Sequence, residues 1–196
     1  MRQHGIDYFE NSRRAVYAQR AYAIANPGGW FEYGANVWGF TACDGPGTMG
    51  SFDRKNRYRY FLDYSARGVG SAHTVDDGTI APTAALSSLP FAPEIVIPAV
   101  EEMHARYGAF IYSKYGFFDS FNRSFTEADV KLTDGRVDAN FGWIAKDYLG
   151  IDQGPILAMI GNYRNELVWD DMRKCAPLRR GLERAGFSGG WLAKTG

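Results

Sequence analysis

The sequence predicts a mainly α-helical protein in which long, structured loops join the helices. Residues 6–26 consist of strong helix formers without an internal Gly or Pro, and Pro27, Gly28 and Gly29 end the run. Residues 30–75 are rich in Gly, Tyr and Asp and show no sustained periodicity, which is typical of a functional loop region. Alternating helices and long loops suit an α/α toroid, although a compact globular helical domain is the default for such a pattern.

The first predicted helix has two different halves. Residues 15–25 are apolar nearly all round, which predicts that this half is buried among other helices. Asp7, Glu10, Asn11 and Arg14 are spaced to share one face of the other half.

Further elements follow from Pro and Gly signals. Pro93 suits a first helical turn and Gly108 suits a helix end, and Pro98 is expected to kink this helix or shift its start. Short strands are expected near residues 57–64, and a hairpin turn at residues 133–136 within a loop-dominated stretch. The remaining predicted helices cover residues 82–89, 93–107, 156–172 and 177–186.

Length and charge narrow the class of protein. A chain of 196 residues fits a single domain, residues 1–196, and can bury a proper core. Because Lys+Arg and Asp+Glu are equal at 22 each, the chain lacks the positive field expected of a partner for nucleic acid or acidic membranes. Aromatic residues reach 15%, which suits either a tightly packed core or platforms for sugar rings.

Several kinds of chemistry are disfavoured. The histidines His4, His73 and His104 are scattered, so no metal centre is expected, and no cofactor motif is present. There is no Gly-x-Ser-x-Gly elbow and no phosphate-binding Gly-Lys-Ser/Thr loop. Cys43 and Cys175 could form a disulfide, but two free thiols are more common in a chain of this size.

The remaining candidates are carboxylates in loops rich in Gly, Trp and Tyr. Glycoside hydrolysis needs two carboxyl groups, one protonated and one ionised, and an aromatic groove can separate their pKa values by desolvation. Trp38 and Trp143 are candidate sugar platforms beside these carboxylates. The candidate acids are Glu10, Asp44, Asp76, Asp77 and Asp152.

Each candidate also has a purely structural interpretation. Asp152 precedes a helix expected to start near Gly154 and Pro155, and could simply cap it, which is worth about 1 kcal/mol. The Asp-Gly sequences at residues 44–45 and 77–78 suit turns, and Glu10 suits an ion pair on a helix face. Trp38 and Trp143 could equally be core residues. Spacing alone leaves these alternatives open.

Several long segments, in a shared order, resemble the glucoamylase-like family of bacterial proteins. They are residues 8–15 (YFENSRRA), 21–27 (AYAIANP), 38–46 (WGFTACDGP), 76–90 (DDGTIAPTAALSSLP), 148–155 (YLGIDQGP) and 179–187 (RRGLERAGF). The resemblance implies an (α/α)6 toroid, of which this chain supplies roughly the C-terminal half. It also implies an endo-β-1,2-glucanase-like glycoside hydrolase of family 144, acting on β-glucans by metal-free, inverting acid/base hydrolysis.

The resemblance assigns expected roles to the candidates. Asp152 is expected to be the catalytic base or an essential acid, and Glu10, Trp38, Asp44, Asp76, Asp77 and Trp143 are expected to line the sugar groove. Because family domains are about twice as long and their general acid lies upstream, the isolated chain is expected to show little or no hydrolysis. A complementary half-barrel or a homodimer is the expected partner.

Two alternative functions remain. The chain could be a non-catalytic glucan-binding half-barrel, or a transglycosylase domain that rearranges β-1,2-glucans. The family suggests a periplasmic or extracellular location, although the N-terminus has no apolar signal core and no apolar run is long enough to span a membrane.

Overall fold

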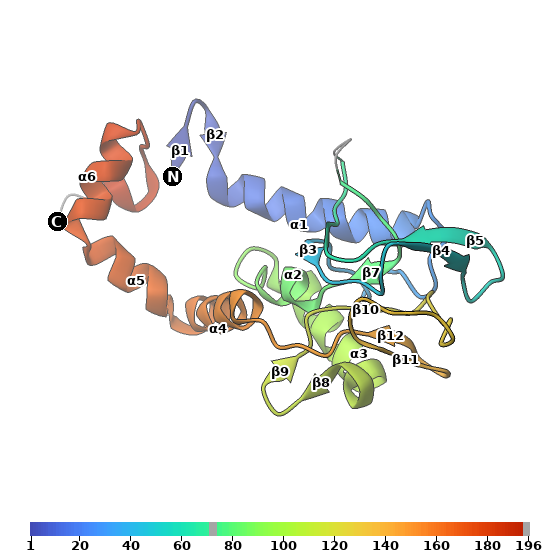
Figure 1. Ribbon diagram of the computed structural model, residues 1–196. Helices are drawn as coiled ribbons and strands as arrows, with labels where there is room; N and C mark the ends of the chain where they lie inside the picture. The colour runs from blue at the N-terminus through green and yellow to red at the C-terminus, as the bar shows by residue number, and fades with distance from the viewer. Residues whose placement is uncertain (71–73, 194–196) are drawn as a thin grey trace.

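The computed structural model describes residues 1–70 and 74–193, and in this part of the chain six α-helices carry most of the regular structure (Figure 1). His73 lies outside the described residues. The helices are α1 (Tyr8–Ala25), α2 (Pro82–Leu86), α3 (Pro93–Ile111), α4 (Gly150–Asn165), α5 (Leu167–Lys174) and α6 (Ala176–Arg184), followed by a 3-10 turn η1 (Gly190–Ala193).

Short strands organise the loops between these helices. The largest sheet is antiparallel and has the order β11-β12-β10-β7; the others pair as β1-β2, β3-β6, β4-β5 and β8-β9. The strands are β1 (Arg2–Gln3), β2 (Ile6–Asp7), β3 (Ala42–Cys43), β4 (Met49–Phe52), β5 (Tyr58–Phe61), β6 (Ser65–Ala66), β7 (Thr79–Ile80), β8 (Tyr112–Ser113), β9 (Gly116–Phe117), β10 (Phe121–Asn122), β11 (Arg136–Asp138) and β12 (Gly142–Ile144).

Helix α1 has well-defined ends close to the predicted ones. The Asp7 side chain accepts hydrogen bonds from the backbone N–H groups of Phe9 and Glu10 at 3.1 and 3.2 Å, which caps the first turn. Asn26 adopts a left-handed conformation and ends the helix. The predicted burial of its second half is wrong, because Val16 and Ala23 are its only buried described residues and Ile24 is 53% exposed.

The core lies between α2, α3 and the four-stranded sheet. Helix α3 does not end at Gly108 as predicted, but continues to Ile111. Tyr107 and Ile111 are buried at its end, and their packing outweighs the cost of about 1 kcal/mol for a helical Gly. Pro98 lies inside this helix without ending it.

The C-terminal helices and the hairpin differ from the predicted boundaries. The expected single helix over residues 156–172 is two helices: α4 begins at Gly150, and Glu166 in a left-handed conformation separates it from α5. The Asn162 side chain fixes the break, since its carbonyl accepts the N–H groups of Val168 and Trp169 at 3.0 Å. The hairpin exists, but its turn lies between β11 and β12 at residues 139–141, not at residues 133–136.

Helices α4, α5 and α6 follow one another along one side of the molecule and bring the chain back to its N-terminal hairpin (Figure 1). Arg2 pairs with Ser188 there. Helices α5 and α6 contribute no buried residue, and large apolar side chains of α4, including Ile151 and Leu157, are 80% and 70% exposed. None of the helices described is both long and apolar enough to cross a membrane. Cys43 and Cys175 are free thiols.

Candidate functional site

Asp152 lies in the first turn of α4, inside the helix rather than before it. The residue preceding the helix is Leu149, which makes no capping hydrogen bond through its side chain. The capping interpretation of Asp152 is therefore wrong. Its side chain is instead 7% exposed, and in the described structure its Oδ2 atom is buried without a hydrogen-bond partner.

A pocket of about 290 Å³ opens beside Asp152. It lies where the N-terminus of α4 meets the start of α2, and the hydroxyl of Thr83 in α2 donates to the Asp152 backbone carbonyl at 3.3 Å. Tyr64, which is 64% exposed, contributes an aromatic ring to the rim. The lining residues are Thr41, Ala42, Tyr64, Thr83, Ala84, Ser87, Asp119, Leu149, Ile151, Asp152 and Pro155.

Asp119 is the second carboxyl group of this pocket, and it is 1% exposed. It lies between β9 and β10, where its backbone N–H donates to the Asp147 carbonyl at 3.1 Å. Its Oδ2 atom accepts hydrogen bonds from the Asp44 backbone N–H at 2.7 Å and from the Ser120 hydroxyl at 3.1 Å. Its Oδ1 atom is buried and, among the residues described, has no donor.

The environment of Asp152 favours its protonated form. Desolvation by burial is the main cause. Asp119 adds to it by accepting a hydrogen bond from the protonated form, and the charges of Asp119 and Asp44 also contribute, raising the pKa of Asp152 to about 7. A carboxyl group at a helix N-terminus is normally stabilised as an anion by the helix dipole. Here burial and like charge outweigh that effect, so the carboxyl group can gain or lose a proton near neutral pH.

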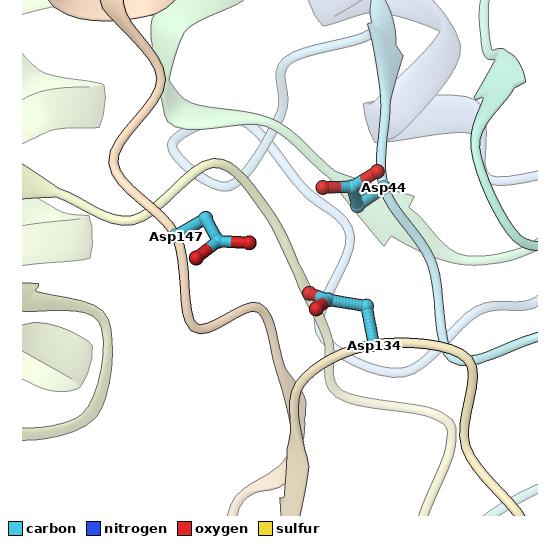
Figure 2. A group of neighbouring side chains, drawn as sticks. All are labelled: Asp44, Asp134 and Asp147. Carbon is cyan, nitrogen blue, oxygen red and sulfur yellow. The ribbon is translucent and has the colours of Figure 1, made fainter.

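Asp44 belongs to a second acidic group next to the pocket. Figure 2 shows Asp44, Asp134 and Asp147 converging from three different loops, and one carboxylate oxygen from each lies within 4.8 Å of the others. Burial, followed by the charges of Asp119, Asp134 and Asp147, raises the pKa of Asp44. Lys146 offsets part of this charge through an ion pair with Asp134 at 2.7 Å. Carboxylates alone do not define a metal site, and we assign no metal ligands here.

Asp76 and Asp77 hold loops together. Asp76 accepts hydrogen bonds from the hydroxyl groups of Tyr22 and Tyr33 at 2.8 and 2.9 Å. Asp77, which is 2% exposed, forms a buried ion pair with Arg67 at 2.7 Å. Both carboxylates are therefore occupied by partners from the protein itself.

The other predicted groove residues lie away from the pocket lining. Glu10 forms an exposed ion pair with Arg14 at 2.9 Å, as its structural interpretation predicted. Trp38 and Trp143 are both fully buried, so neither ring has a face open to a sugar in this conformation. The indole N–H of Trp143 donates to the Asp134 carbonyl at 2.8 Å. Asp44 thus acts on Asp152 through its charge, whereas Glu10, Trp38 and Trp143 are not among the residues that line the pocket.

Asp119 was missed by the sequence analysis, as were Asp134, Asp147 and Tyr64. Asp119 lies in a Gly- and Phe-rich loop, a setting similar to those of the predicted carboxylates. That composition was the available signal, but no spacing links residue 119 to residue 152.

Helices joined by loops that gather carboxyl groups around a pocket are consistent with a carbohydrate-active enzyme domain. Residues 1–176 match the protein family described as "Putative glucoamylase", and the chain belongs to this family. The resemblance found in the sequence is thereby confirmed.

Similar proteins with more specific descriptions are glucan hydrolases. The chain is 30% identical over 178 residues to an exo β-1,2-glucooligosaccharide sophorohydrolase (non-reducing end) of Parabacteroides distasonis, covering 91% of this chain and 20% of the relative. It superimposes with a TM-score of 0.74 and 31% identity on the Chitinophaga pinensis endo-β-1,2-glucanase in complex with sophorotriose and glucose, covering 97% of this chain and 38% of that one. The chain also superimposes on a Bacteroides uniformis protein described as a putative glucoamylase, with a TM-score of 0.75 and 36% identity, covering 97% of this chain and 38% of that one. The chain therefore spans well under half the length of these relatives.

Proposed function

We propose that this chain is part of a glycoside hydrolase that cleaves β-glucans, with β-1,2-linked glucan as the substrate and Asp152 as a catalytic carboxyl group. The observation that carries the proposal is the buried Asp152 side chain in an open pocket, with a pKa of about 7. A group that transfers a proton works best when its pKa lies near the working pH. The β-1,2 linkage is proposed because the relatives named above act on β-1,2-glucans.

We propose further that additional helices cover this chain and supply the second catalytic carboxyl group. The chain matches 38% of the length of the solved endo-β-1,2-glucanase. Its apolar side chains also form an open groove of about 610 Å³ between α1, α5 and α6, which includes Phe9, Trp169 and Leu182. Exposed apolar surface of this kind commonly marks an interface. The covering helices would come from a complementary half-barrel or a second copy of the chain.

A chimera tests the proposal. The matching part of the Chitinophaga pinensis endo-β-1,2-glucanase is replaced by this chain, and release of reducing ends from linear β-1,2-glucan is measured. We expect turnover by the chimera and a loss of about 10²–10⁴-fold in kcat on Asp152→Asn, since that is the usual contribution of general acid or base catalysis. Asp171→Asn is the matched control, because Asp171 is exposed on α5 and pairs with Lys174 at the surface.

Two results would refute the proposal. A folded chimera that binds sophorotriose without hydrolysing the glucan would identify the chain as a glucan-binding module. A folded Asp152→Asn chimera that retains the turnover of the Asp171→Asn control would remove Asp152 from the catalytic machinery.

A further inference from the structure

The Asp119 and Asp152 side chains line the same pocket, and each has a buried oxygen atom that meets no donor in the described structure. These atoms are Asp119 Oδ1 and Asp152 Oδ2. Two ionised carboxylates in the lining of one pocket would repel each other, and burial would leave both acceptors unsatisfied. A single proton between them removes both costs, because one carboxyl group then donates to the other.

We propose that Asp119 and Asp152 form a carboxyl pair that shares one proton at neutral pH, and that Asp119 is the positioning residue that orients Asp152 and holds it protonated. The catalytic meaning of this pair rests on the proposed function, whereas its existence does not. The proton is not consumed: the pair releases it to solvent or substrate and regains it from water.

The surroundings decide which member is the anion. Asp119 Oδ2 accepts two hydrogen bonds, from the Asp44 backbone N–H and from Ser120, and these stabilise a negative charge. At Asp152, burial is the largest influence and opposes the charge, and the carboxylates of Asp119 and Asp44 act in the same direction. Asp119 is therefore the ionised partner and Asp152 carries the proton.

Other groups near the pair are few among the residues described. Tyr64 is the other titratable side chain lining the pocket, and no basic side chain lines it. Arg67 acts on Asp44 through its charge but is paired with Asp77, and both side chains of this pair are essentially buried. No cation in the described lining thus competes with the shared proton as the neutralising charge.

The pair can be tested without any enzymatic assay, by following the side-chain ¹³C carboxyl resonances of the full 196-residue chain against pH. In the unaltered protein we expect the Asp152 carboxyl group to titrate near pH 7. Titration of Asp152 below about pH 5, as for an ordinary carboxyl group, would overturn the proposal.

Two substitutions separate the pair from a general effect of charge. Asp119→Asn removes the neighbouring anion and offers an amide donor to Asp152. The titration midpoint of Asp152 should therefore move down by about one pH unit or more. Asp147→Asn is the matched control, since Asp147 contacts Asp119 through its backbone carbonyl and the loss of its side-chain charge should leave the Asp152 titration unchanged. Equal shifts in both variants would overturn the role of Asp119, as would an unchanged midpoint in Asp119→Asn.

These outcomes are distinct from failure of the proposed function. A chimera without turnover leaves the titration of the pair intact, and an ordinary titration leaves the turnover measurement intact. If both hold, the pH profile of kcat in the Asp119→Asn chimera should shift in the same direction as the midpoint of Asp152, whereas a purely structural role for Asp119 would lower kcat at every pH alike.

Discussion

Replacing Asp77 with asparagine tests whether this residue serves the fold, as its contacts indicate, or the substrate. The two Asp77 carboxylate oxygens accept Arg67 Nε at 2.8 Å and Arg67 Nη2 at 2.7 Å. Each oxygen also accepts a backbone N–H, from Thr79 at 3.2 Å and from Leu62 at 3.0 Å. In either orientation, the amide group introduced by Asp77→Asn would therefore point N–H donors at other donors.

The energetic cost follows from the burial of the pair. The Arg67 and Asp77 side chains are 0% and 3% exposed. In the unaltered chain, burial disfavours the guanidinium charge, and the hydrogen bonds and charge of Asp77 offset this by raising the pKa of Arg67 above its ordinary value. Because a guanidinium group does not lose its proton in proteins, Asp77→Asn leaves a buried charge without its partner. Removing one partner of a buried ion pair costs about 3–5 kcal/mol. At roughly 2–4 °C per kcal/mol for a chain of this size, Tm should fall by about 6–20 °C.

Urea denaturation at pH 7, followed by circular dichroism, measures this cost. The matched control is Asp171→Asn, because Asp171 and its partner Lys174 are 75% and 72% exposed and such surface pairs contribute at most about 1 kcal/mol. If Asp77→Asn unfolds within about 1 kcal/mol of the control, the ion pair does not stabilise the fold as argued, and a role for Asp77 in binding substrate regains support.

Three further predictions concern the pocket and its supporting loops. Gly135→Ala should lower the free energy of unfolding by about 1–3 kcal/mol, because Gly135 has φ +74° and an added Cβ would overlap the Ile144 carbonyl; Gly154→Ala, in open space on α4, should be neutral or stabilising in the same urea titration. Trp143→Phe should lower the free energy of unfolding by about 1–3 kcal/mol, measured by thermal unfolding, because the ring is fully buried and the hydrogen bond from its indole N–H to the Asp134 carbonyl is lost. The folded pKa of Asp152 is raised to about 7, so the contribution of this residue to stability is full below about pH 4 and is lost as pH rises through 7. Asp152→Asn should therefore gain stability relative to the unaltered chain between pH 5 and 8. A constant difference in the free energy of unfolding across that range would contradict this prediction.

Local signals in the sequence predicted the bounds of α1 closely. A run of helix formers that ends at Pro27, Gly28 and Gly29 predicted residues 6–26, and the helix spans Tyr8–Ala25. The end of α3 and the start of α4 were missed because tertiary packing decides them. Helix α3 continues past Gly108 because Ile111 is buried at its end. Helix α4 starts at Gly150, although Gly154 and Pro155 suggested a later start.

The residues of the candidate site also differ in whether the sequence could identify them. Asp152 could be selected from the sequence because it lies in a family motif, and Asp76 and Asp77 were selected for the same reason although they bind partners within the protein. Asp119 could not be selected, since it lies 33 positions from Asp152 and joins the same pocket only where the loop between β9 and β10 meets the first turn of α4. Motifs identify residues that a family retains, but they do not separate a carboxylate that ties loops together from one that faces a pocket.

The hydrogen-bond partners of each carboxylate distinguish those that tie loops together from those that line the pocket. Asp77 meets Arg67 and two backbone donors, so its charge is neutralised and a substrate would have to displace stronger partners. Asp119 and Asp152 each keep a buried oxygen that no donor of the described chain meets, at a cost of about 1–3 kcal/mol for each such atom. Because both of these atoms belong to residues of the same open pocket, a shared proton accounts for them together. Asp119 and Asp152 are therefore the residues to which we assign the proposed proton transfer, whereas Asp76 and Asp77 support the surrounding loops through partners within the protein.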